Sequence, residues 1–199
     1  MDKPATTAFP IHELIASRWS PRAFSPDRPV TDDQLGSLLE AARWAASCFN
    51  EQPWRYVMAR REDRDAFAAI LGCLMEKNQS WAKDAAVLMI SVAASTFAHN
   101  GKPNRHAAHD VGQASAQMAL QATAMGLCMH QMAGFDVARA REVCRIPEGH
   151  EPISAIAIGY IGNPDDLPEG MRQGERGPRS RKALADIAFT DTFGNSFAP

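Results

Sequence analysis

The sequence predicts an α+β or α/β sandwich, in which helices alternate with the strands of a central sheet. Two segments carry most of this prediction. Residues 85–94 form a continuous apolar run, which is typical of a strand buried on both faces. Residues 104–125 form the longest helical pattern, rich in Ala, Gln and Met, and Gly126 follows where a helix commonly ends. One sheet covered by helices accommodates both segments.

The remaining elements follow in order along the chain. A first helix is expected over residues 11–17, because Pro21 prevents its continuation. A second helix begins at the capping box Thr31-Asp32-Asp33-Gln34, and its apolar residues recur at helical spacing. We further expect a strand over 55–60, a helix over 63–75, a strand over 127–132, a helix from Asp136 to Cys144, and a last strand over 153–160.

The composition changes after residue 163. Residues 164–178 are rich in Pro, Gly and charge, so we expect a surface excursion rather than part of the core. The tail from residue 184 is apolar enough to pack, and a partner subunit is one candidate surface for it. We therefore predict a single domain over residues 1–199, in which 164–199 form the excursion and a C-terminal arm.

Composition and charge exclude several classes of protein. The chain has 199 residues, of which 45% are hydrophobic and 22% charged, as in an ordinary globular protein. A formal net charge of −2 argues against a general nucleic-acid binder. No apolar run is long enough to cross a bilayer, and the first residues lead into no secretory signal. The four cysteines lack C-x-x-C spacing, so we expect reduced thiols and a cytoplasmic location.

Two arginine motifs lie near opposite ends of the chain. In Arg18-x-Ser20-x-Arg22, alternate residues of an extended segment project to the same side, so two guanidinium groups and a hydroxyl can face one anion. Arg179-x-Arg181 repeats the arrangement. The alternative is that these arginines are separate surface residues in intramolecular ion pairs. A third cluster covers residues 47–54 and ends in Pro53-Trp54, where we expect Trp54 to be a core residue.

With these motifs the chain resembles the FMN-dependent nitroreductase family over nearly its whole length. The resemblance implies a three-layer α+β sandwich, with a mixed antiparallel sheet flanked by helices, in an intertwined homodimer. Its two FMN molecules would lie in clefts at the subunit interface. The matching residues are Arg18-x-Ser20-x-Arg22-x-Phe24, Ala46-Ser47-Cys48-Phe49-Asn50-x-Gln52-Pro53-Trp54, Asn78, Gly134-Phe135-Asp136, Ile158-Gly159-Tyr160 and Arg179-Ser180-Arg181-Lys182.

The resemblance also implies an activity. Members of the family take a hydride from NAD(P)H and pass electrons to a nitroaromatic, a quinone or a similar small acceptor, by a ping-pong mechanism. The implied partners are therefore a second copy of the chain and a small-molecule acceptor, with no nucleic acid and no membrane.

The same resemblance assigns expected roles to individual residues. Those expected at the FMN phosphate and ribityl oxygens are Arg18, Ser20, Arg179 and Arg181, and Trp19 is expected among the other cofactor-binding residues. Arg22 is the expected catalytic residue, a cation that stabilises negative charge at N1 and O2 of the reduced ring. Asn78 would bond the same end of the ring. The backbone near N5 and O4 would come from Gln131, Met132, Ala133 and Gly134, and the partner subunit would add Ala46, Ser47, Cys48 and Asn50.

Three residues depart from common family residues. Trp81 stands where many members have Lys, Cys48 where Ser is usual, and Ala133 where better-known nitroreductases have Glu. Two alternatives therefore stay open. One is a flavoprotein of the same fold with another redox reaction, such as an oxidase, a dehydrogenase or a reductive dehalogenase. The other is a protein that binds or stores FMN without turnover.

A metal site is the remaining alternative from the sequence. His106 and His109 have the i, i+3 spacing of two ligands, with His99 nearby. No further ligand stands at a recognisable spacing, so we expect solvated or helix-capping histidines and no metal. The chain contains neither G-x-G-x-x-G nor a P-loop motif.

Overall fold

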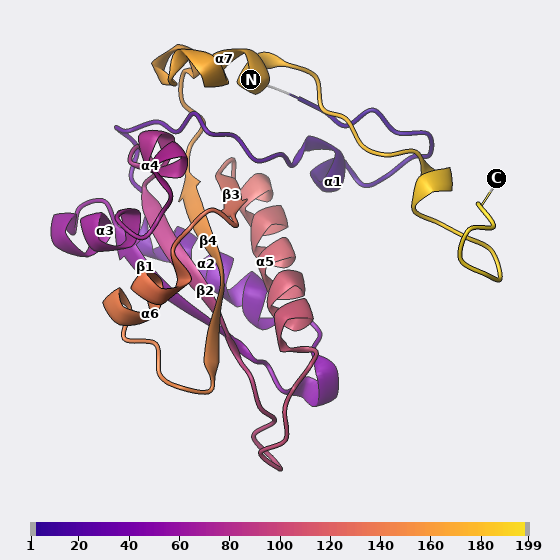
Figure 1. The fold of residues 1–199 in the computed structure, drawn as a ribbon. Helices are drawn as coiled ribbons and strands as arrows, with labels where there is room; N and C mark the ends of the chain where they lie inside the picture. The colour runs from indigo at the N-terminus through magenta and orange to yellow at the C-terminus, as the bar shows by residue number, and fades with distance from the viewer. Residues whose placement is uncertain (1–2, 198–199) are drawn as a thin grey trace.

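The computed structural model describes residues 3–197 and has an antiparallel sheet at its centre (Figure 1). Its four strands lie in the order β1-β2-β4-β3, and each pair of neighbours is antiparallel. Their bounds are Trp54–Arg60 for β1, Val87–Ala94 for β2, Cys128–Met132 for β3 and His150–Gly159 for β4. The predicted α+β class and the antiparallel sheet are confirmed.

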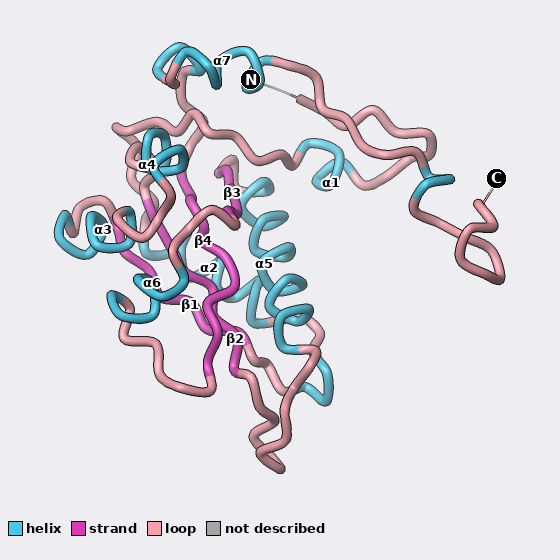
Figure 2. The backbone as a smooth tube through the Cα atoms, in the orientation of Figure 1, coloured by secondary structure: helices cyan, strands magenta, loops and turns pink. Residues whose placement is uncertain are grey.

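Helices cover both faces of this sheet, which makes three layers (Figure 2). Successive residues of β2 point to opposite faces. Leu88 and Ile90 join the core beneath α3, α4 and α6, while Val87 and Met89 join the core beneath α2 and α5. The helices are α2 (Asp32–Arg43), α3 (Arg64–Leu71), α4 (Glu76–Ala82), α5 (Ala107–Ala124) and α6 (Val137–Val143).

Local signals for helix ends are confirmed. The Thr31 hydroxyl accepts from the Gln34 amide at 3.2 Å, and the Gln34 side chain accepts from the Thr31 amide at 3.1 Å. Gly126 has a φ of +69°, as expected after a helix end. Trp54 is 8% exposed and belongs to the core, also as predicted.

The single helix expected over residues 63–75 was wrong. Helix α3 ends at Leu71, Leu74 pairs with Phe135, and α4 begins at Glu76. The Met75 amide donates to the Gly134 carbonyl at 3.0 Å. These contacts with the loop after β3 end the helix before residue 75. The sequence of residues 63–75 alone does not indicate them, because the partners lie far away along the chain. Their consequence is that α4 lies directly against the end of β3.

The segment after β4 is better anchored than its composition suggests. It contains helix α7 (Glu169–Arg176), which was not foreseen. Leu167 is 4% exposed and Glu175 only 1% exposed, so the excursion sends two residues into the interior. Beyond α7, residues 177–197 leave the body of the domain beside the N-terminal arm (Figure 1). That arm leads into the short helix α1 (Glu13–Ser17).

Close packing fixes the chain that follows the first arginine motif. The Gly162 amide donates to the Ala23 carbonyl at 2.8 Å, and the Ser25 amide donates to the Tyr160 carbonyl at 2.9 Å. A Cβ atom on Gly162 would lie 2.4 Å from the Phe24 carbonyl oxygen, so only glycine permits this approach. The end of β4 thus holds the segment that carries Arg22.

Over residues 3–197, no helix combines the length and hydrophobicity that a membrane span requires. The expected cytoplasmic location stays a prediction.

Candidate functional site

The two arginine motifs meet in one pocket, although they lie near opposite ends of the chain. The pocket has a volume of about 240 Å³ and lies between the N-terminal arm, α7 and the chain that follows α7. It is lined by Lys3, Arg18, Trp19, Ser20, Arg22, Gly174, Glu175, Pro178, Arg179 and Arg181. The structure therefore brings together all six residues that the sequence predicts in these motifs.

The pocket is strongly cationic. Burial lowers the pKa of Arg18, and the neighbouring charges of Arg179 and Arg181 lower it further. Burial, followed by the charge of Arg181, also lowers the pKa of Arg179. Within residues 3–197, none of the ion pairs involves these arginines or Arg22. The alternative that these arginines are separate surface residues in intramolecular ion pairs therefore does not agree with the part of the chain that the structure describes.

Hydrogen bonds hold the arginines in place. One Arg18 nitrogen donates to the Ser20 hydroxyl at 3.2 Å. Arg179 donates to the backbone carbonyls of Lys3 at 2.6 Å and Ala16 at 2.7 Å, which ties the C-terminal segment to the N-terminal arm. Arg181 donates to the Ser180 carbonyl at 2.7 Å. A cluster of like charges held in this way is suited to a compact, multiply charged anion such as a phosphate.

Asn78 and the end of β3, which are expected at the flavin ring, contact each other outside the pocket lining. The Asn78 side-chain amide donates to the Gly134 carbonyl at 2.9 Å. A Cβ atom on Gly134 would lie 2.7 Å from that nitrogen, so glycine is required for the contact. Gln131 and Ala133 are exposed and Met132 is buried, so the end of β3 alternates between surface and core.

Trp81 is not a surface residue of the site. It is 1% exposed, and its ring packs 4.7 Å from the His130 ring and 6.1 Å from the Phe24 ring, between ring centroids. Where many family members have a lysine, this chain therefore has a core aromatic residue.

The 46–50 segment lies at the opposite end of the domain from the pocket. The N-terminal arm, which carries part of the pocket lining, passes the C-terminal end of α5 (Figure 1), whereas the 46–50 segment bonds Asp110 near the N-terminal end of α5. Helix α5 has 18 residues, which at 1.5 Å per residue is about 27 Å. One chain therefore does not join the 46–50 segment to the arginine pocket.

The 46–50 segment has a strained backbone. Phe49, Asn50 and Gln52 have φ angles of +54°, +56° and +52°, a region that costs non-glycine residues about 1–3 kcal/mol each. The Cys48 amide donates to the buried Asp110 carboxylate at 3.0 Å, and the Gln52 amide donates to the Ser47 hydroxyl at 3.0 Å. Sequence reasoning missed Asp110 because it lies 62 residues from Cys48.

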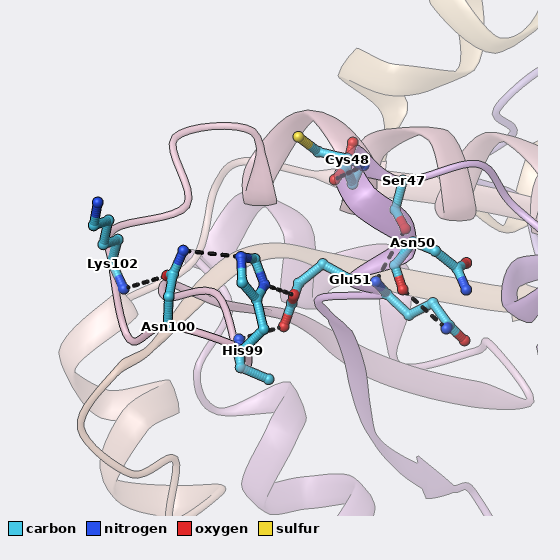
Figure 3. A network of polar contacts seen from close by, with 10 residues as sticks. Ser47, Cys48, Asn50, Glu51, His99, Asn100 and Lys102 are labelled. Atoms are coloured by element: carbon cyan, nitrogen blue, oxygen red, sulfur yellow. Dashed lines mark hydrogen bonds and ion pairs between the residues drawn. The ribbon is translucent and has the colours of Figure 1, made fainter.

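A polar network supports this strained turn from the loop that precedes α5 (Figure 3). The Glu51 carboxylate accepts from the Ala98 amide at 2.7 Å and lies 3.7 Å from His99 Nδ1. Asn100 continues the network from His99, with a nitrogen–nitrogen distance of 2.8 Å, to the Lys102 amide at 2.9 Å. The network accounts for a conformation that the local sequence disfavours.

The histidines make local contacts. His109 Nδ1 lies 3.2 Å from Asp110 Oδ1, and His99 faces Glu51. In the part of the chain that the structure describes, no three side chains of His, Cys, Asp or Glu gather as metal ligands would. The described cysteines are unpaired thiols.

His130 makes stability depend on pH. Burial lowers its pKa below the ordinary 6.5, Arg22 lowers it further, and the bond to the Pro21 carbonyl and the charge of Glu175 oppose this. The folded state then binds fewer protons than the unfolded state below pH 6.5. Stability is therefore present above that pH and lost as the pH falls towards the folded pKa.

Replacing His130 with Phe should flatten this dependence, because the ring that packs on Trp81 is kept and the titrating group is lost. Thermal melts of parent and His130→Phe between about pH 5 and 8 measure it. His106→Phe is the control, with the parental slope expected. An unchanged slope in His130→Phe would contradict the assignment.

Known proteins resemble this chain in sequence and in fold. The nitroreductase family model matches residues 15–160. An uncharacterized 15.4 kDa protein of Mycolicibacterium smegmatis is 32% identical over 148 residues, which is 71% of this chain and 98% of that protein. The major NAD(P)H-flavin oxidoreductase of Aliivibrio fischeri is 26% identical over 216 residues, covering 89% and 96% of the two chains. The crystal structure of an oxidoreductase containing FMN superposes with a TM-score of 0.90 and 36% identity over 96% of each chain. The chain belongs to the nitroreductase family.

Proposed function

We propose that this protein is an FMN-dependent oxidoreductase that uses NAD(P)H. The arginine pocket is the observation that carries the proposal, because it offers a phosphate-sized anion several guanidinium groups without competing ion pairs. The similarity to an FMN-containing oxidoreductase and to an NAD(P)H-flavin oxidoreductase supports it. Bound FMN would accept a hydride from NAD(P)H and pass electrons to a nitroaromatic, quinone or similar small acceptor in a ping-pong cycle.

The pocket residues fit the phosphate end of FMN. A phosphate monoester is largely dianionic at neutral pH and accepts several strong hydrogen bonds. Arg18, Ser20 and Arg181 would bind it, with Arg179 holding the two arms together around it. Lys3 lies 4.6 Å over the Trp19 ring, which keeps a further cation at the rim. Each charge-assisted bond contributes about 1.5–3 kcal/mol.

Arg22 and the end of β3 would contact the flavin ring. Arg22 lines the pocket and would place its positive charge at N1 and O2 of the ring, where reduction adds negative charge. Asn78 would reach the same end of the ring. The backbone of Gln131, Met132, Ala133 and Gly134 would follow the N5 and O4 edge, where small residues permit close approach.

A homodimer would complete the site. The 46–50 segment of one copy would reach the pocket of the other, because in its own chain it lies at the far end of α5, a helix about 27 Å long. Ala108, Gly112 and Ala116 recur every four residues on the exposed side of α5, where small residues let a second helix approach closely. The arm also exposes apolar side chains, with Ile187 61% and Phe193 94% exposed. A second subunit would cover these surfaces.

The direct test is spectroscopic. Purified protein should be yellow with about one FMN per subunit, and anaerobic addition of NADH or NADPH should bleach the flavin rapidly. Slow or absent bleaching with FMN bound would favour a binding protein over an enzyme. Failure to bind FMN at low salt would exclude the proposal.

Removal of the phosphate ligands should weaken FMN binding in a coupled way. Arg18→Ala and Arg181→Ala should each raise the FMN dissociation constant about 10- to 100-fold, since each removes one charge-assisted interaction. Because both would touch one phosphate, the double variant should differ from the sum of the single effects. Fluorescence titration of the apoprotein measures this. Arg64→Ala, an exposed arginine outside the pocket, is the control; negligible single effects would favour a structural role.

Arg22 should affect the chemistry more than binding. Its loss should lower the midpoint potential of the flavin and slow reduction by NAD(P)H, because the cation favours the reduced ring over the oxidised one. FMN affinity should fall less in Arg22→Ala than in Arg18→Ala, and Arg22→Lys should keep much of the activity. Spectroelectrochemistry decides the question. A parental potential in Arg22→Ala with FMN bound would remove Arg22 from the catalytic residues.

Charge on the exposed side of α5 should break the dimer. Ala116→Arg places a long cation where close helix packing is expected, so it should yield monomers with reduced FMN content. Sedimentation velocity at micromolar concentration measures this, and Ala68→Arg on the exposed side of α3 is the control. A stable, FMN-loaded monomer of the parent protein would contradict the dimer.

A further inference from the structure

Glu175 is a buried acid inside a cationic pocket. Glu175 is 1% exposed. It is the one acid among the residues that line the pocket, which also include Lys3 and four arginines. A buried carboxylate is costly unless hydrogen bonds compensate for lost water. It also repels the anion that the pocket is suited to bind. Glu175 therefore has a role other than binding the anion.

The carboxylate binds the backbone that carries Arg22. Glu175 Oε1 accepts from the Arg22 amide at 2.7 Å and from the Ala23 amide at 3.0 Å, across 153 and 152 residues of sequence. The Lys3 ammonium donates to the Glu175 carbonyl at 2.7 Å, which ties the N-terminal arm to the same point of α7. Two backbone amides, of which that of Ala23 is buried, therefore depend on one carboxylate oxygen.

The other side of the same segment is held by the sheet. His130 of β3 bonds the Pro21 carbonyl at 2.8 Å, and its ring packs on Trp81. The Gly162 amide bonds the Ala23 carbonyl at 2.8 Å. Residues 21–23 are thus held from β3, from the end of β4 and from α7. Only α7 contributes a charged side chain to this arrangement.

We propose that Glu175 is a positioning residue, which fixes the backbone at Arg22 and Ala23 and so sets the reach of the Arg22 guanidinium into the pocket. This rests on the proposed role of Arg22 at the flavin. Without the carboxylate, two amides lose their acceptor and the segment keeps only its contacts to the sheet. The negative charge itself is dispensable for positioning, because a neutral amide oxygen can accept the same bonds.

Two substitutions separate the bonds from the charge. Glu175→Gln keeps an acceptor oxygen and loses the negative charge, so FMN should bind at least as tightly and the flavin potential should equal or exceed the parental one. Compared with Glu175→Gln, which matches it in charge, Glu175→Ala should have a lower midpoint potential and about tenfold slower reduction by NAD(P)H. Asp165→Asn is the control, because Asp165 lies outside the pocket and pairs with Arg176, which is in α7 like Glu175.

A double-mutant cycle tests whether Glu175 acts through Arg22. In an Arg22→Ala background, Glu175→Ala and Glu175→Gln should have the same potential, because the side chain that the acceptor positions is gone. An equal difference between these two variants in both backgrounds would overturn the proposal. So would equal potentials of the two variants with Arg22 present and FMN bound.

A measurement on FMN-free protein separates this proposal from the proposed function. Amide hydrogen exchange at Arg22 and Ala23 should accelerate more than tenfold in Glu175→Ala and less in Glu175→Gln, with Asp165→Asn like the parent. If Glu175→Ala does not fold, Glu175→Met takes its place, because it keeps the side-chain volume but offers no oxygen acceptor: faster exchange than in Glu175→Gln supports the contact, and equal exchange overturns it. Accelerated exchange in a protein that binds no FMN would leave the contact standing and exclude the proposed function.

Discussion

Mutual repulsion among the pocket arginines is the constraint on which the rest of the site depends. Beyond the effect of burial, the charges of Arg179 and Arg181 lower the pKa of Arg18, and the charge of Arg181 lowers the pKa of Arg179, while no acid within residues 3–197 forms an ion pair with them. A fold tolerates such a cluster only where other contacts hold it in place. Here the backbone supplies them, since Arg179 donates to carbonyls of the N-terminal arm. The arms are therefore part of the binding site rather than appendages to it.

The sheet gives the pocket its fixed edge. Pairing between the end of β4 and residues 23–25 requires a glycine at position 162, and His130 of β3 holds Pro21 from beside it. Because β3 also leads to Gly134, whose carbonyl accepts from Asn78 of α4, one strand connects the edge of the pocket to Asn78. The sheet therefore fixes the position of residues 21–25, which have no regular secondary structure, relative to Asn78 and Gly134.

The sequence predicted those features whose signal is local or chemical. The capping box at Thr31 and the glycine after α5 act within a few residues, so their patterns are readable. Arginine spacing is readable for another reason, because few residue types bind phosphate with paired donors. The residues that were missed act over long separations. Glu175 finds its partners 153 residues away, and α3 ends early because of contacts with the loop after β3. Nor does composition show that Trp81 enters the core.

Both ends of the described chain contribute to one small pocket, and this has a practical consequence. Lys3 lies on its wall, so a change at the N-terminal end stands within a few residues of the charge cluster, while Arg181 joins the wall to the C-terminal arm of residues 182–197. The colour of a preparation would then report on the integrity of the two ends as directly as on the folded centre. Limited proteolysis that trims an arm should release cofactor while circular dichroism still reports an intact sheet.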